Sequence, residues 1–195
     1  MDQIRITQQD ADELTEALAP IFNHGVERQR KLLRQMCEDE KWAQVFRPDV
    51  PRLFADRSLL LLTHVLRTDY VQKRRQQLSS DVFRFLIYKV YSHAPCPEHA
   101  VLDGVIFPRD HTMLKHCMPP NGWRCLCDVS GAASERMAPL LGGTRMIDTC
   151  DVTGHGDTAW VAGFEVDPAF RNNAIPTMLD TLHHIAQGHA DTELA

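Results

Sequence analysis

Cysteine and histidine residues near the middle of the chain have the types and spacing of a metal site. Cys96 and His99 form a C-x2-H pair, and the C-x-C pair of Cys125 and Cys127 begins 26 residues after His99. Three thiolates and one imidazole suit tetrahedral Zn²⁺. Four protein ligands would close the coordination shell against water, so this set predicts a structural zinc rather than a catalytic one.

The local geometry expected for the C-x-C pair agrees with a shared ion. Residues 123–129 are predicted to form a strand, in which Cys125 and Cys127 point to the same face. Their thiols would lie about 6–7 Å apart along the strand, from its rise per residue. The alternative is that both cysteines are small buried hydrophobic residues, with His99 hydrogen-bonded in a turn.

Other residues offer rival chemistry. His111, His116 and Cys117 lie between the two halves of the predicted site and are rival ligands. A second hypothesis is therefore a zinc-dependent hydrolase or toxin-like nuclease that uses His99, His111 or His116 and keeps one metal position open. The chain has no Gly-rich phosphate loop, H-E-x-x-H motif or paired-carboxylate motif. We therefore predict a non-enzymatic role with no small-molecule substrate.

A basic cluster supports a third hypothesis, a DNA-binding module. Arg67 lies in a predicted long helix that ends with Lys73, Arg74 and Arg75. These residues could contact DNA or an acidic partner, or they could be a solvated helix C-terminus, where positive charge is favourable. The net charge of the chain is −5, from 21 basic and 26 acidic residues. Such a balance is atypical of a protein that binds free nucleic acid.

The first half of the chain has the apolar spacing of helices. Thr7 is a plausible N-cap for a helix with Leu14 and Leu18 on one face, and Pro20 should kink or split it. Pro48 and Pro51 form the first credible boundary.

A second, longer helix follows this boundary. We expect Asp56 or Ser58 to cap it and the helix to run to about Leu78. Its predicted buried stripe consists of Leu59, Leu62, Leu66 and Tyr70.

The second half changes to the alternation of strands and ends in a helix. The predicted strands are 83–91, 105–107, 123–129 and 159–166, with a short strand near 145–147. Pro176 suits the first position of a last helix that stops at Gly188. The predicted fold class is α+β, with N-terminal helices followed by a small mixed or antiparallel sheet and a C-terminal helix.

Two blocks of the sequence form a recognisable pattern: one runs from His99 to the Leu-Asp103-Gly104 turn, and the other is Pro119-Pro120-Asn121-Gly122-Trp123 followed by Cys-Leu-Cys. Together they resemble the signature of the Mu F-like minor head proteins, the phage head morphogenesis family. The flanks around Leu66-Arg67-Thr68 and 163–168 are similar to family elements as well. Relatives often have C-x2-C at the position of Cys96-x-x-His99, so the resemblance favours the four-ligand site.

The resemblance implies a division and a role. Residues 1–52 would be an N-terminal helical arm, 53–170 the head morphogenesis domain and 171–195 a C-terminal helix and tail. The family implies a minor structural protein of a tailed-phage head, acting in head assembly or genome packaging and delivery. Its partners would be the portal protein and the major capsid protein, with DNA as an open alternative. We expect the chain in the reducing host cytoplasm during assembly and then in the virion head, without a membrane span.

Overall fold

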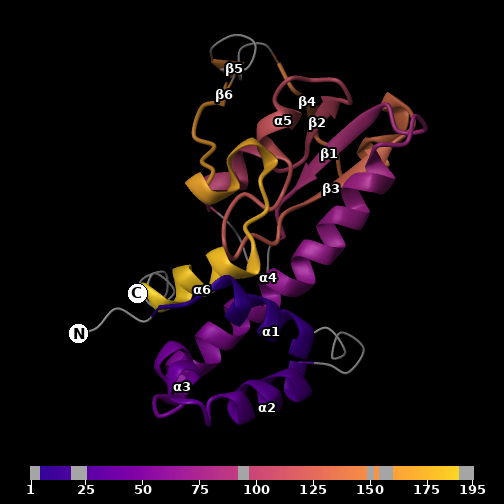
Figure 1. The fold of residues 1–195 in the computed structure, drawn as a ribbon. Coiled ribbons are helices and arrows are strands. Elements are labelled where there is room, and N and C mark those ends of the chain that lie inside the picture. Colours follow the sequence, from indigo (N-terminus) through magenta and orange to yellow (C-terminus); the bar gives the residue numbers. More distant parts are fainter. Residues whose placement is uncertain (1–4, 19–25, 92–96, 149–151, 154–159, 189–195) are drawn as a thin grey trace. The chain divides into compact units, whose positions relative to one another are not determined.

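The computed structural model of this protein describes residues 5–18, 26–91, 97–148, 152–153 and 160–188. The chain forms two compact units. We call residues 1–66 together with 176–195 the helical unit, and residues 67–175 the sheet unit. The predicted α+β class is confirmed, because N-terminal helices are followed by a small mixed sheet and a C-terminal helix (Figure 1). The predicted division into residues 1–52, 53–170 and 171–195 stays a prediction.

The helical unit contains three short helices, part of a long one and the C-terminal helix: α1 (Gln8–Leu18), α2 (Val26–Met36), α3 (Glu40–Phe46), α4 (Pro51–Leu78, up to Leu66) and α6 (Met178–Ala186). The Asp10 N–H donates to Oγ1 of Thr7 at 3.4 Å, and the Thr7 N–H donates to the Asp10 carboxylate at 2.7 Å. The predicted cap at Thr7 is thus confirmed. The predicted kink at Pro20 lies outside the described residues.

The long helix α4 begins earlier than its predicted caps. It starts at Pro51, so Asp56 and Ser58 lie inside it and the prediction that either caps it was wrong. Proline suits this position because the first turn of a helix needs no backbone donor from it. Ser58 lies within the helix and is fully buried.

The predicted buried stripe of α4 was also largely wrong. Leu59, Leu66 and Tyr70 are 46%, 39% and 43% exposed, whereas the buried leucines of α4 are Leu60, Leu61, Leu62 and Leu78. Four consecutive leucines place apolar side chains all around a helix, since successive residues differ by about 100°. The run therefore cannot indicate which face the neighbouring helices cover.

The sheet unit is built on a four-stranded sheet with the order β3-β1-β2-β4. Its strands are β1 (Phe85–Lys89), β2 (Val105–Pro108), β3 (Asp128–Ala132) and β4 (Arg145–Met146). Strand β1 is antiparallel to both β2 and β3, and β4 pairs parallel to β2. Ile87, Ile106, Ala132 and Ala138 form a fully or nearly fully buried cluster against this sheet. The central position of β1 places its side chains among the segments that hold the candidate site.

Shorter elements complete the sheet unit. The 3-10 helix η2 (Pro97–Leu102) precedes β2, and α5 (Leu114–Cys117) follows it. Two 3-10 turns, η3 (Glu135–Met137) and η4 (Pro139–Leu141), lie between β3 and β4, and η7 (Pro168–Asn173) ends the unit. Strands β5 (Val152–Thr153) and β6 (Trp160–Val161) pair antiparallel in a separate two-stranded sheet.

Two predicted strands were wrong in extent, and one helix start was shifted. Residues 123–127 form a turn and an irregular segment, and the strand begins only at Asp128. The strand expected over 159–166 is limited to Trp160–Val161, since the chain turns at Gly163, whose φ is +78°. The last helix begins after Thr177, which forms a capping box with Asp180, rather than at Pro176.

None of the helices among the described residues has the length and apolar character needed to cross a membrane.

We expect the stability of the helical unit to fall as the pH drops below about 6.5. His64 is buried, which lowers its pKa despite the nearby Pro176 carbonyl and Asp180. Its Nε2 donates to that carbonyl oxygen at 3.0 Å. The unfolded chain binds this proton more readily, so the stability that neutral His64 confers is present above pH 6.5 and is lost as the pH falls through the folded-state pKa.

The measurement is denaturant unfolding of the wild type and of His64→Gln at neutral and mildly acidic pH. Glutamine can donate to the same carbonyl but does not titrate, so the variant should lose less stability on acidification. An identical pH dependence in both proteins would contradict this assignment.

Candidate metal centre

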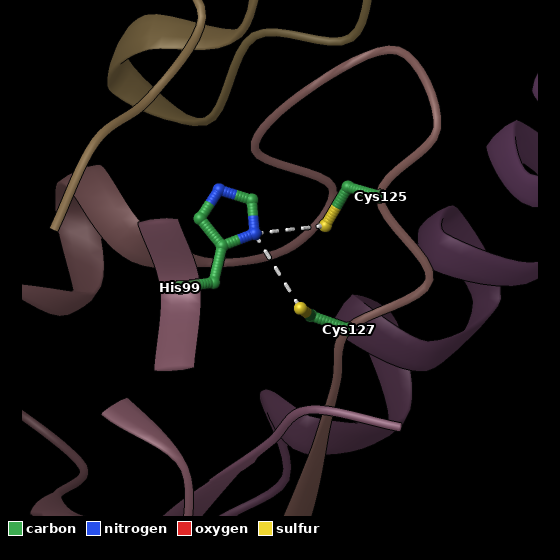
Figure 2. Close-up of side chains that lie close together, drawn as sticks. All are labelled: His99, Cys125 and Cys127. Atoms are coloured by element: carbon green, nitrogen blue, oxygen red, sulfur yellow. Dashed lines mark hydrogen bonds between the residues drawn. The ribbon is translucent and has the colours of Figure 1, made fainter. Parts of the chain in front are cut away.

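Three side chains from two distant segments meet inside the sheet unit. His99 lies on η2, while Cys125 and Cys127 lie in the segment between the turn at Gly122 and strand β3. Both sulfurs point at the same ring nitrogen of His99 (Figure 2). Nδ1 lies 3.6 Å from Sγ of Cys125 and 3.5 Å from Sγ of Cys127. All three ligand atoms lie within 4.8 Å of one another, so the group could hold a metal ion.

The distances match those of ligands around one tetrahedral zinc. With Zn–S near 2.3 Å, Zn–N near 2.05 Å and a tetrahedral angle, sulfur and nitrogen should lie about 3.6 Å apart. The observed separations are 3.5 and 3.6 Å. One imidazole nitrogen carries one proton or one lone pair, so it can make a well-directed hydrogen bond to only one of the two sulfurs. The approach of both sulfurs to this nitrogen is the arrangement that a shared metal ion would require.

The site is buried as well as compact. His99 is 5% exposed, Cys125 3% and Cys127 1%. Free thiolates would be unfavourable here, because burial penalises an unpaired charge. A divalent ion compensates that charge and needs deprotonated thiols as ligands. The shielding from solvent suits an ion with a structural role.

The turn that carries the two cysteines replaces the strand expected from the sequence. The N–H of Cys125 donates to the carbonyl oxygen of Gly122 at 3.1 Å and closes a turn. Residues 125 to 127 then run in an irregular conformation before β3. The expected convergence of the two sulfurs on one side does occur, but a turn produces it rather than the alternation of a strand.

The remaining predicted ligands have different positions. Cys96, the expected fourth ligand, lies outside the described residues. Cys117 is fully buried outside the group, and burial raises the pKa of its thiol to about 12. The ring of His111 packs edge-on against Phe107, with centroids 5.7 Å apart. His116 places Nδ1 3.0 Å from Oδ1 of Asn172. The three rival ligands thus lie outside the group that converges on Nδ1 of His99.

Phe164 packs against the imidazole, and two further aromatic rings pack against Phe164. The ring of Phe164 lies 5.4 Å from that of His99, centroid to centroid. Tyr88 on β1 meets Phe164 edge-on at 6.2 Å, and Trp160 meets it at 5.5 Å. Phe164 is 1% exposed. One side of the imidazole therefore faces a buried aromatic ring.

Tyr88 adds a polar contact that the sequence did not reveal. Its hydroxyl accepts a hydrogen bond from Nδ2 of Asn121 at 2.9 Å and is hydrogen-bonded to Cys127. Burial raises the pKa of Tyr88 well above its ordinary value, and the nearby cysteines raise it further. The hydroxyl therefore keeps its proton and can donate it toward the sulfur of Cys127. Such outer hydrogen bonds orient metal ligands and tune their basicity.

The Asp103-Gly104 turn lies beside the site, between η2 and β2. Gly104 has a φ of +71°, and a Cβ built there would lie 2.5 Å from Oγ1 of Thr144. Its N–H donates to the carbonyl oxygen of Tyr88, while Oδ1 of Asp103 accepts from the N–H of Val90. The turn thus joins the end of η2 to the end of β1.

The Pro119-Pro120-Asn121-Gly122-Trp123 block packs beside the site, where Asn121 contacts Tyr88. Asn121 is 1% exposed, and its Nδ2 also donates to the Cys117 carbonyl oxygen at 3.0 Å. The backbone carbonyl oxygen of Asn121 accepts a hydrogen bond from the N–H of Asp167 at 2.9 Å. The ring of Trp123 packs edge-on against Phe170 at 5.2 Å. The block therefore anchors the turn before Cys125 through buried contacts.

The predicted basic cluster is divided between internal and surface roles. Arg75 donates to the carbonyl oxygens of Met118, Pro119 and Asn173 at 3.0, 3.1 and 2.7 Å. Arg74 donates to the Val129 carbonyl, as part of the same unit.

The other two members of the cluster differ from this pair. Lys73 is an exposed residue paired with Asp69 at 2.8 Å, and the guanidinium of Arg67 lies 5.3 Å from the ring centroid of Tyr70. Contact of the cluster with DNA or a partner stays a prediction, and two of its members already hold the backbone around the site.

Comparison with known proteins gives one partial similarity. A protein of Escherichia phage Mu described as "Putative capsid assembly protein F" is 34% identical to this chain over 77 residues. The aligned part is 38% of this chain and 18% of that protein, so the chain spans less than a fifth of its relative's length. No protein-family model matches the chain, and no solved structure matches it either. The similarity supports a relation to phage capsid assembly and no finer assignment.

The first test of the site is its zinc content. We expect the full chain to bind one zinc ion, and Cys125→Ser or Cys127→Ser to weaken binding by roughly a hundredfold. Cys117→Ser is the matched control, because this cysteine is equally buried but lies outside the group. Metal analysis after dialysis against a chelator separates the variants. Equal zinc contents in all three variants would refute the assignment.

A second test addresses the hydroxyl of Tyr88. Tyr88→Phe removes only the group that bonds to Cys127 and should lower zinc affinity about tenfold. Tyr70→Phe serves as the control, since its hydroxyl bonds to Asp128 at 2.6 Å instead. Competition with a chromophoric chelator measures affinity, and thermal unfolding is recorded separately. If both variants bind zinc like the wild type, Tyr88 has no role in holding the metal.

Proposed function

We propose, from the partial similarity to the Mu capsid assembly protein, that this chain is a minor structural protein of a tailed-phage head. That similarity, 34% identity over 77 residues, is the observation that carries the proposal. The chain would act in head assembly or in genome packaging and delivery, and its partners would be the portal protein and the major capsid protein. It would be present in the host cytoplasm during assembly and in the virion head afterwards.

The proposed role of the metal is to stiffen the sheet unit. A Zn²⁺ ion held by His99, Cys125 and Cys127, with Cys96 proposed as the fourth ligand, would tie η2 to the segment that leads into β3. Its binding free energy would then contribute directly to folding. A docking protein benefits from such a fixed scaffold, because contacts on a rigid surface need less ordering on binding.

The geometry favours this structural role over the alternative zinc hydrolase or nuclease. A catalytic zinc keeps a position open to water or substrate. The three converging residues are each at most 5% exposed, and His111 and His116 lie outside the group. In its low exposure to solvent, the group resembles a closed structural site.

The test of the proposal is genetic and uses a phage that encodes this chain. Purified heads should contain the protein at low copy number by mass spectrometry, and its deletion should reduce the yield of filled heads. Complementation with the Cys125→Ser/Cys127→Ser chain should fail, while Cys117→Ser should succeed. Heads that lack the protein, together with normal assembly in the deletion strain, would overturn the proposed function.

If heads form normally with the Cys125→Ser/Cys127→Ser chain, the assembly role survives but the role of the metal in it does not. The two parts of the proposal can thus fail separately.

A further inference from the structure

A basic hollow lies in the helical unit and shares no residue with the predicted basic cluster of α4. Its volume is about 330 Å³, and it is lined from α2 by Arg30, Lys31, Arg34 and Glu27, and from α4 by Phe54. Three cations face one acid in this lining. The composition is that of an anion site rather than an apolar pocket.

The side chains are arranged to receive oxygen atoms. The guanidinium carbon of Arg34 lies 4.2 Å from the ring centroid of Phe54, a buried residue. A guanidinium held by its face on a ring keeps its N–H edge for a bidentate acceptor. Arg34 lines the hollow, so this edge is within reach of an anion bound there.

The one acid of the hollow compensates little of this charge. Glu27 pairs with Nη1 of Arg30 at 3.4 Å, and its side chain is 90% exposed. Exposed pairs of this kind are weak and easily rearranged. Lys31 and Arg34 are both exposed, so their charges remain available to a ligand.

The charge pattern of α2 favours a repeating anion. The helix carries Arg28, Arg30, Lys31 and Arg34 against Glu27, a balance of +3 (4 − 1), although the whole chain has −5. The row of four cations is spread over about 9 Å of the helix axis, from Arg28 to Arg34. A nucleic-acid strand carries a phosphate for each 3.4 Å of its axis, so the row spans more than one phosphate. A single carboxylate would use only one end of it.

We propose that this hollow and the basic row of α2 bind backbone phosphates of nucleic acid. Arg34 and Arg30 would hold one phosphate in the hollow, and Lys31 and Arg28 would meet its neighbour. The contact involves charge and backbone geometry rather than base edges, so binding is independent of sequence. This proposal is separate from the metal centre.

The test measures binding of the full chain to a fluorescent DNA duplex by anisotropy over a range of salt concentrations. Lys31→Gln/Arg34→Gln should lower affinity at least about tenfold at low salt and reduce the slope of log K against log salt by about two. Arg136→Gln/Arg171→Gln removes two exposed cations elsewhere and should stay within about twofold of wild type. Lys31→Glu alters an exposed residue without disturbing Arg34 on Phe54, and it should also weaken binding.

Two results would overturn the proposal. The first is no DNA binding by the wild type, or equal losses in both double variants. The second is α2-dependent binding of polyglutamate with none of DNA, which would indicate an acidic protein partner instead.

Discussion

The approach of two sulfurs to one imidazole nitrogen is the interaction that brings the two segments of the candidate site together. Cys125 and Cys127 reach Nδ1 of His99 at 3.6 and 3.5 Å from a segment that is remote in sequence. Without an ion, one ring nitrogen meets two sulfurs and can make a well-directed hydrogen bond to only one of them. With an ion, the same distances become the edges of a coordination tetrahedron.

The surrounding contacts hold the two ligand segments in place. Tyr88 on the central strand reaches both Cys127 and Asn121, so it connects β1 with the turn before the cysteines. Arg75 fixes the other side of that turn through the carbonyl oxygens of Met118 and Pro119. Burial lowers the pKa of this arginine, but its three carbonyl acceptors compensate the loss of solvent. A cation predicted to face a partner thus also has a structural role inside the unit.

The residues of the site could largely be predicted from their types and spacing, whereas less of the site's geometry could be predicted. Cysteine and histidine at metal-ligand spacing indicate their chemistry directly, and His99, Cys125 and Cys127 do meet. The strand predicted over residues 123–129 was wrong in its first part. A turn closed by the carbonyl oxygen of Gly122 forms there, although the side chains alternate as in a strand. Tyr88 was missed because alternation places it in the core without showing which group its hydroxyl meets. A buried tyrosine needs a polar partner, and that was the signal available.

The relation to phage capsid assembly comes from sequence similarity, whereas the proposed metal-linked scaffold of the sheet unit comes from the geometry of the three side chains. X-ray absorption at the zinc K-edge of the purified full chain tests that scaffold most directly. We predict a first shell with sulfur near 2.3 Å and imidazole nitrogen near 2.0 Å, with the sulfur contribution reduced in the Cys125→Ser variant. A shell of nitrogen and oxygen alone, or a folded protein that binds no zinc, would contradict the account.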